Sequence, residues 1–201
     1  MDAARYYVAL LLVIAHPPRI CLWLVIHPFA SFWRRLGTAR TYAILAIPVL
    51  IYASGVGVLR RDLLSVQFGT SYAALALAAI SLAAAIALSV KRRRQLHFGA
   101  LSGLPELSAH LYPGTLLTAG VYSRIRHPRY VEATLWALAY ALFANHLASY
   151  VVVLLGMPLI FLVVILEERE LLVRFGAAYQ EYARRVPRFL PRRWDRRGDG
   201  P

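Results

Sequence analysis

The sequence predicts an all-α integral membrane protein with about five transmembrane helices and a C-terminal amphipathic helix at the membrane surface. The first reason is composition: of 201 residues, 59% are hydrophobic and only 16% are charged, which exceeds the apolar share of an average soluble domain. The second reason is order, because long apolar runs alternate with short clusters of arginine and lysine. We expect residues 1–201 to form a single membrane domain.

The predicted spans are apolar stretches that come close to the length needed to cross a bilayer, about 20 helical residues. They are Tyr42–Leu59, Tyr72–Val90, Val131 to about Asn145, and Ser149–Leu166. A further stretch, Tyr6–Trp33, is apolar enough to cross but contains the motif His16-Pro17-Pro18-Arg19 and the pair His27-Pro28. Proline removes a hydrogen bond from a helix, and an arginine at mid-membrane costs roughly 2.5–3.5 kcal/mol. This first span is therefore expected to be bent or partly interfacial.

The charges of the connecting segments predict the orientation. Strongly and weakly basic connections alternate along the chain, and residues 145–149 contain no lysine or arginine. Because short cytoplasmic loops carry an excess of these residues, the pattern predicts an outside N-terminus and a cytoplasmic C-terminus. The basic segment around His127 then lies on the cytoplasmic side.

After the last span, apolar residues recur at helical spacing. They are Leu171, Leu172, Phe175, Tyr179, Tyr182 and Val186. Charged residues occupy the opposite face, so the pattern predicts an amphipathic helix that lies along the membrane surface and ends at Pro187 and Pro191.

Several classes of function are disfavoured. The formal net charge of +13 does not indicate a nucleic-acid partner, because the arginines cluster between apolar segments. A single cysteine, Cys21, excludes a disulfide framework or a CxxC site, and no HExxH motif occurs, so no metal site is predicted. The pair of glycines at Gly55 and Gly57 lacks the third glycine and the preceding strand of a dinucleotide-binding motif.

Three polar features are predicted to meet at the cytoplasmic boundary. They are the segment Gly120–Tyr130, the pair Glu167 and Glu168, and the surface helix with Tyr179, Tyr182 and Arg185. Antiparallel packing of the last two spans, which a short loop joins, brings these features together. Separately, each has a structural explanation: topogenic arginines, an ion pair of the glutamates with Arg126, and an interfacial belt of tyrosines.

The run LLTAGVYSRIRHPRYVEATLW, the pair EE and the run RFGAAYQEYARRVPRFLP follow one another in that order. Together they closely resemble the isoprenylcysteine carboxyl methyltransferase family and the related phospholipid methyltransferases. The resemblance covers about Thr115–Pro191. It implies a single membrane methyltransferase domain over residues 1–201, with a cofactor-binding half at about residues 112–191.

The resemblance implies S-adenosylmethionine as cofactor and assigns site residues by position. The implied cofactor contacts are Leu116, Leu117, Gly120, Tyr122, His127, Pro128, Tyr130 and Glu167. The implied catalytic residues are Arg126, His127 and Glu168. The chemistry is consistent, since Arg126 and His127 can donate to the cofactor carboxylate, Glu167 can accept from its amino group or ribose, and tyrosine faces suit both adenine and a sulfonium cation. For an amine or thiol acceptor, His127 or Glu168 would be the base.

Two departures from the family pattern fall on the acceptor side. Glu132 stands where the family usually has glycine, and it is expected to face a cationic or amine acceptor or to pair with Arg129. Many members also have an arginine about one turn before the glutamate pair, where this chain has Val163–Leu166. The candidate acceptor residues are Glu132, Tyr179, Tyr182 and Arg185.

The implied activity is methyl transfer at the cytoplasmic membrane face to a hydrophobic or lipid-linked acceptor, by default carboxyl O-methylation of isoprenylcysteine-like substrates. The implied partners are the lipid bilayer and this acceptor, without nucleic acid. Two alternatives remain: an NADPH-dependent membrane reductase of the sterol-reductase type, and a non-enzymatic membrane scaffold or transporter. The pairs at His16 and His27 lack a preceding GVY turn and are expected to have no glutamate opposite them.

Overall fold

The computed structural model describes residues 2–93 and 115–191, and this part of the chain is helical apart from one isolated bridge between Gln67 and His146. The helices are α1 (Asp2–Ile26), α2 (Ala30–Leu36), α3 (Thr38–Leu63), α4 (Tyr72–Arg93), the 3-10 helix η1 (Gly120–Ser123), α7 (Pro128–Ala144), α8 (Leu147–Phe175) and α9 (Ala177–Arg185). The prediction of an all-α membrane protein is confirmed. The first three residues of the predicted cofactor-binding half, 112–114, lie outside the described residues.

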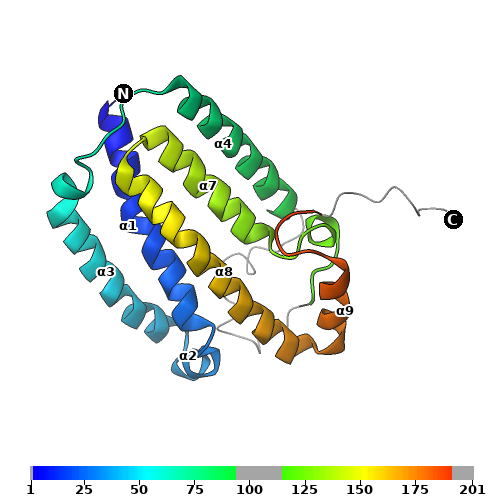
Figure 1. The fold of residues 1–201 in the computed structure, drawn as a ribbon. Helices are drawn as coiled ribbons and strands as arrows, with labels where there is room; N and C mark the ends of the chain where they lie inside the picture. The colour runs from blue at the N-terminus through cyan, green and yellow to red at the C-terminus, as the bar shows by residue number, and fades with distance from the viewer. Residues whose placement is uncertain (1, 94–114, 192–201) are drawn as a thin grey trace, which may run out of the picture.

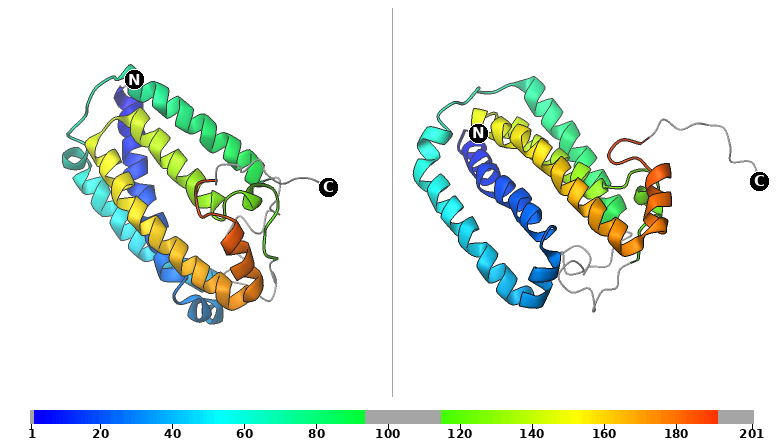
Figure 2. Two further views of the ribbon diagram at one scale, coloured as in Figure 1. Left: turned by 45° about the vertical axis from the view of Figure 1, so that its right-hand side comes forward. Right: turned by 60° about the horizontal axis from the view of Figure 1, so that its bottom comes forward.

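Four helices, α1, α3, α4 and α8, are long and apolar enough to cross a membrane. With 17 residues, α7 is shorter, but it lies in the middle of the bundle, between α4 on one side and α1 and α8 on the other (Figure 1). Helix α3 packs on the outer side of α1. Figure 2 shows that α9 and the turn before α7 lie together at one end of the bundle.

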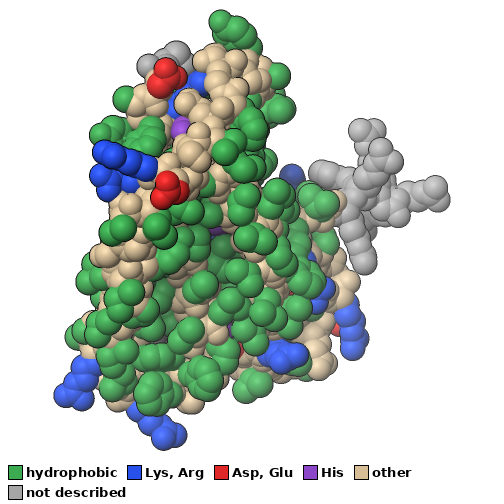
Figure 3. Space-filling view, turned by 60° about the vertical axis from the view of Figure 1, so that its left-hand side comes forward, with side chains coloured by type: hydrophobic (Ala, Val, Ile, Leu, Met, Phe, Trp, Pro, Cys, Tyr) green, Lys and Arg blue, Asp and Glu red, His purple; other side chains and the backbone are tan. Residues whose placement is uncertain are grey.

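Hydrophobic side chains cover most of one broad face of the molecule, and lysine and arginine side chains lie mainly near its borders (Figure 3). Large apolar side chains such as Leu50, Ile51 and Leu154 are exposed on the surface of the molecule. A face of this size and composition suits contact with lipid. The chain is therefore a multi-pass membrane protein.

Small residues let the central helices approach closely. Ala141 and Ala144 of α7 are fully buried. At Gly156 of α8, an added Cβ would lie only 2.6 Å from Nε2 of His16. Glycine is thus the residue that allows α1 to pack against α8, as small residues do in other membrane bundles.

Helix α1 runs without a break through Pro17 and Pro18. Proline has no N–H group, so the carbonyl of Val13, four residues before Pro17, lacks its helical donor. The hydroxyl of Tyr52, on α3, donates to this carbonyl at 2.9 Å. The first span, which was expected to be bent or partly interfacial, stays helical past His16 to Ile26, and residues 27–29 separate it from α2.

The end of the bundle away from α9 is tied by backbone and side-chain hydrogen bonds. Asn145 adopts a left-handed conformation, φ 54°, in the short turn between α7 and α8, and its carbonyl accepts from the N–H of Phe68 at 3.0 Å. Arg5 is almost fully buried and donates to the carbonyl of Gly69 and the hydroxyl of Thr70. These bonds fix the α3–α4 connection to both the α7–α8 turn and helix α1.

The end of the last span differs from the prediction. Helix α8 continues past Leu166 to Phe175, so it includes Glu167 and Glu168 as well as the first part of the predicted surface helix. It ends because Gly176 takes a positive φ of 52° and donates its N–H to the carbonyl of Leu172, a glycine termination that lets the chain turn. The amphipathic helix α9 is therefore shorter than predicted.

Candidate active site

The residues Arg126 and His127 lie in a turn that two segments of the chain hold. The N–H of Arg126 donates to the carbonyl of Pro187 at 2.8 Å, and the N–H of His127 donates to the carbonyl of Arg188 at 3.1 Å. Pro128 occupies the first position of α7, where its missing N–H costs nothing. The sequence RHP thus starts α7 while its backbone is bound to the C-terminal tail.

Glu168 of α8 is the centre of the polar contacts. Its Oε1 atom lies 3.0 Å from Nε2 of His127 and 3.1 Å from a guanidinium nitrogen of Arg126. Its Oε2 atom accepts from Arg188 at 2.8 Å. One carboxylate, 14% exposed, therefore connects the start of α7, α8 and the tail after α9.

Glu167 lies on the other side of His127, with its Oε2 atom 3.6 Å from Nδ1 of the imidazole. Burial alone would lower the pKa of His127, but the nearby carboxylate of Glu167 and the hydrogen-bonded carboxylate of Glu168 outweigh burial and raise this pKa above its ordinary value. The imidazole is thereby stabilised in its protonated form between two carboxylates.

Helix α9 contributes tyrosines. The hydroxyl of Tyr182 donates to the carbonyl of Tyr122 at 2.7 Å and so joins α9 to η1. Burial raises the pKa of Tyr179 to about 12 and also raises the pKa of Tyr182. Both phenols are therefore neutral hydrogen-bonding groups at neutral pH.

These elements enclose a polar cavity of about 210 Å³. Ten of the site residues predicted from the sequence line it: Leu116, Leu117, Tyr122, Arg126, His127, Pro128, Tyr130, Glu167, Tyr179 and Tyr182. Six other lining residues were not predicted as site residues: Arg92, Thr115, Arg129, Leu171, Arg174 and Phe175. Helical spacing could have predicted Arg174 and Phe175, because they lie about two turns after Glu167 on the same helix.

Four predicted site residues do not line this cavity: Gly120, Glu132, Glu168 and Arg185. Gly120 begins η1 with a positive φ of 58°, a conformation that favours glycine. Glu168 does not line the cavity itself, but its carboxylate contacts Arg126 and His127, which do. Arg185 binds Glu181 on the surface of α9, where its side chain is 72% exposed.

Glu132 is buried and does not pair with Arg129, so this expected partner is wrong. Its carboxylate accepts from Nε of Arg92 at 2.6 Å and from the hydroxyl of Ser89 at 2.8 Å, both on α4. The guanidinium of Arg129 instead lies over the ring of Trp23, 4.7 Å from its centroid. The sequence did not predict this pair because the predicted span ended at Val90, whereas α4 extends to Arg93 and so includes Arg92.

The expectation that no glutamate lies opposite His27 is also wrong. Its Nδ1 atom lies 3.0 Å from Oε2 of Glu170, which is on α8. The imidazole also stacks on Trp23. The longer α8 explains the error, because Glu170 was placed beyond the span and is in fact on the same helix as Glu167.

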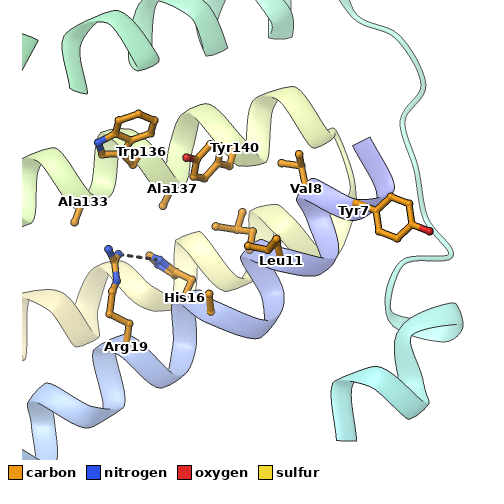
Figure 4. A pocket seen from close by; sticks show the side chains of 11 residues that line it. Tyr7, Val8, Leu11, His16, Arg19, Ala133, Trp136, Ala137 and Tyr140 are labelled. Carbon is orange, nitrogen blue, oxygen red and sulfur yellow. Dashed lines mark hydrogen bonds between the residues drawn. The ribbon is translucent and has the colours of Figure 1, made fainter. Parts of the chain in front are cut away.

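Two further cavities continue from the polar cavity. A middle cavity of about 170 Å³ shares Arg92, Arg129 and Tyr130 with it. The middle cavity in turn shares Arg19, Ala133 and Trp136 with an apolar groove of about 400 Å³ between α1 and α7 (Figure 4). A series of adjoining cavities therefore leads from the carboxylates to the lipid-facing part of the bundle.

Comparisons with known proteins are consistent with this arrangement. The family model described as phospholipid methyltransferase matches residues 73–178, which is more than half of the chain and includes α4, α7, the glutamate pair and most of the cavity lining. No solved structure matches the chain.

Three curated relatives share stretches of sequence with the chain. Methanethiol S-methyltransferase 2 of Bradyrhizobium diazoefficiens is 39% identical over 46% of this chain and 33% of its own length. Protein-S-isoprenylcysteine O-methyltransferase of Schizosaccharomyces pombe is 34% identical over 38% of this chain and 33% of its own length. Delta(14)-sterol reductase of Mus musculus is 37% identical over 38% of this chain but only 19% of its own length. The matches thus span about a third or less of these relatives.

Proposed function

Because the chain belongs to the phospholipid methyltransferase family, we propose that it is an S-adenosylmethionine-dependent methyltransferase whose acceptor is hydrophobic or lipid-linked. The observation that carries the proposal is that a middle cavity adjoins both a polar cavity, lined by His127 and Glu167, and an apolar groove between α1 and α7. A polar methyl donor and an apolar acceptor need these two environments side by side.

The polar cavity fits the functional groups of the cofactor. Three side chains that line it have a buried polar atom without a hydrogen-bond partner in the described part of the chain: Nε of Arg126, Oε2 of Glu167 and the hydroxyl of Tyr179. Such atoms are costly unless a ligand or water satisfies them. Arg126 suits the carboxylate of the cofactor, Glu167 suits its amino group or ribose, and the tyrosine faces suit adenine and sulfonium.

When bound, S-adenosylmethionine supplies an electrophilic methyl group. The protein's own contribution is to hold the surrounding groups in position. Glu168 fixes Arg126 and His127 from α8, and Arg188 holds Glu168 from the other side. The bond from Tyr182 to Tyr122 keeps α9 against η1 as one wall of the cavity.

The charges at the site favour an acceptor that is ionised without a base. His127 is stabilised in its protonated form, so it is a poor proton acceptor at neutral pH. Glu168 accepts from three cationic side chains and is equally unsuited to accept a proton. A carboxylate is already ionised at neutral pH, so we propose carboxyl O-methylation of an isoprenylcysteine-like or similar apolar carboxylate.

We further propose that the end of the bundle with α9 and the polar cavity faces the cytoplasm and that the N-terminus lies outside. The concentration of arginine in the segments at this end supports this orientation. A reporter fused to the C-terminus is expected to give a cytoplasmic signal. A signal from the opposite side of the membrane would contradict the orientation.

The cofactor is tested by titrating the purified, detergent-solubilised protein with S-adenosylmethionine and, separately, with NADPH. We expect binding of S-adenosylmethionine only. Glu167→Gln should weaken it about tenfold, because one charged hydrogen-bond acceptor is lost. The matched control is Glu181→Gln, which changes a carboxylate on α9 that pairs with Arg185 on the surface. Tight binding of NADPH without binding of S-adenosylmethionine would favour the reductase alternative.

The acceptor is tested by transfer of a radiolabelled methyl group. The acceptors compared are prenylcysteine analogues, membrane lipid extracts, small thiols and small amines. We expect label in a base-labile methyl ester of an apolar carboxylate. Label found only in a thioether or an amine would contradict the proposed O-methylation.

A further inference from the structure

We infer that Arg19 and Arg129 bind the carboxylate head of an amphiphilic acceptor whose single apolar tail lies in the groove between α1 and α7. This inference rests on the proposed function for the fate of the bound molecule. The binding itself does not require the methyl donor, so it can be tested separately.

Arg19 is a cation in an otherwise apolar part of α1, about two turns before the helix ends. Its guanidinium donates to Nδ1 of His16 at 3.3 Å, and Figure 4 shows both side chains pointing from α1 towards α7. No acidic side chain in residues 2–93 or 115–191 forms an ion pair with Arg19. Because a charge in an apolar helix that can span a membrane is costly, Arg19 calls for an anionic partner.

The middle cavity has an excess of positive charge. Arg92 and Glu132 both line it but neutralise each other, and the second oxygen of Glu132 is bound to Ser89. Arg19 and Arg129 remain, and among the described residues no carboxylate pairs with either of them. Helix α8 adds no charge to the lining of the middle cavity, since its lining residues are Ile160 and Val163. The cavity thus presents two cations to whatever occupies it.

Arg129 is held in a defined place. Its guanidinium lies over the ring of Trp23 on α1, 4.7 Å from the centroid, a cation–π contact that restricts the long side chain. The residue also lines the polar cavity, together with Tyr130. A carboxylate bound between Arg19 and Arg129 therefore lies beside the proposed site of the methyl donor.

The apolar groove begins where the middle cavity ends. It follows α1 from Arg19 back to Tyr7, which is about 18 Å along a helix axis. Leu11 and Leu12 line it from α1, and Trp136 and Tyr140 line it from α7. An apolar groove of this length and of about 400 Å³ that ends at a cation suits one hydrocarbon tail with an anionic head.

The test uses a bromine-labelled long-chain fatty acid and the corresponding alcohol, with quenching of tryptophan fluorescence as the readout. Trp136 lines both the groove and the middle cavity, so bound bromine lies close to it. The quenching that remains in Trp136→Phe comes from other tryptophans and from probe dissolved in the detergent. This background is subtracted. We expect the acid to bind about tenfold more tightly than the alcohol, because a charged hydrogen bond is formed only with the acid.

Arg19→Gln and Arg129→Gln should each reduce the preference for the acid to near unity, while Arg19→Lys should keep part of it. The charge-matched control, Arg61→Gln, changes an exposed arginine of α3 and should leave the preference unchanged. Ala15→Phe, which fills an exposed position of the groove lining, should weaken the acid and the alcohol equally. Circular dichroism melts of each variant establish that it is folded.

Equal binding of acid and alcohol to the unchanged protein would overturn the inference, and so would a preference that persists in both glutamine variants. Tighter binding of an alkyl phosphate than of the acid would overturn the assignment to a carboxylate. A protein that keeps the acid preference but does not bind S-adenosylmethionine would refute the proposed function and leave this site in place.

Discussion

The turn at His127 and helix α1 bury the same dipeptide, His-Pro, in different surroundings. His127, His16 and His27 are all at least 93% buried. His127 lies between two glutamates at the start of a helix, whereas His16 contacts a cation inside a helix and His27 pairs with one glutamate at a helix end. Burial therefore does not distinguish them; the charges around each imidazole and the cavity beside it do.

The difference follows from where proline stands. Pro128 is the first residue of α7, so His127 remains outside the helix and its N–H can bond to the tail at Arg188. Pro17 is inside α1, where the helix continues and His16 keeps a helical position against Gly156. Proline at a helix start places the preceding side chain in a turn that distant segments can reach.

The strongest test of this comparison is Glu168→Gln. The change leaves Arg126, His127 and Arg188 without their shared carboxylate, and each hydrogen bond to a charged group is worth about 1.5–3 kcal/mol. We expect a marked fall in the thermal melting temperature and weaker cofactor binding, because Arg126 and His127 lose the carboxylate that holds them. Glu181→Gln, which breaks an exposed pair on α9, should have little effect. Similar melting of the two variants would show that the His127 turn does not depend on Glu168.

The next largest effect is expected at Glu132. Its substitution tests whether this glutamate serves the active site or stabilises the packing of α4 against α7. Glu132→Gln leaves the buried guanidinium of Arg92 unpaired, so we expect a loss of about 3 kcal/mol in stability. The double variant Arg92→Met with Glu132→Leu removes both charges and should regain most of that loss, measured by thermal melting. If the double variant is no more stable than the single one, the pair is not the reason for the burial of Glu132.

A smaller effect is expected from exchanging the histidines themselves. His127→Gln should weaken binding of S-adenosylmethionine about tenfold, because it removes a charged donor beside Glu167. His27→Gln should change the affinity by no more than about twofold, because its partner Glu170 does not line the polar cavity. Calorimetric titration of both variants measures the difference. Equal losses would place His27 in the cofactor site.

The smallest effect is a dependence of stability on pH. Since the pKa of His127 is raised in the folded protein, its contribution to stability is complete below the unfolded value of about 6.5. It is lost as the pH rises through the folded pKa. We expect the melting temperature to fall by a few degrees from about pH 6 to about pH 9. In His127→Gln this fall in melting temperature with pH should be absent. An unchanged pH profile in the variant would show that His127 is not the titrating group.

Much of the fold was predictable because long apolar runs and basic clusters report spans directly. The helices α3 and α4 were placed within a few residues of their predicted ends. The end of α8 was not, because Glu167 and Glu168 were expected to mark the exit from the membrane, and only Gly176 ends the helix. Local composition indicates where a helix becomes polar, but the backbone conformation of a glycine determines where it stops.

The candidate site was predictable where its residues are close in sequence or belong to the family motif, as for His127 and Tyr130. The partners from other helices were not. Arg92, Arg19 and Glu170 reach the site or its surroundings only because α4, α1 and α8 pack around α7. A pairing between residues 40 positions apart, such as Arg92 and Glu132, leaves no periodic pattern in a single sequence.

The shortness of α7 has a consequence for the surrounding bilayer. Its 17 residues extend about 25 Å, whereas a typical hydrocarbon core is about 30 Å thick. Such hydrophobic mismatch is accommodated by local thinning of the bilayer or by flanking polar side chains that reach outwards. Arg129 and Tyr130 stand in the first turn of α7, so the headgroup region is expected to dip towards the middle cavity. A lipid in the adjacent leaflet can then present its head to the cavity without leaving the membrane.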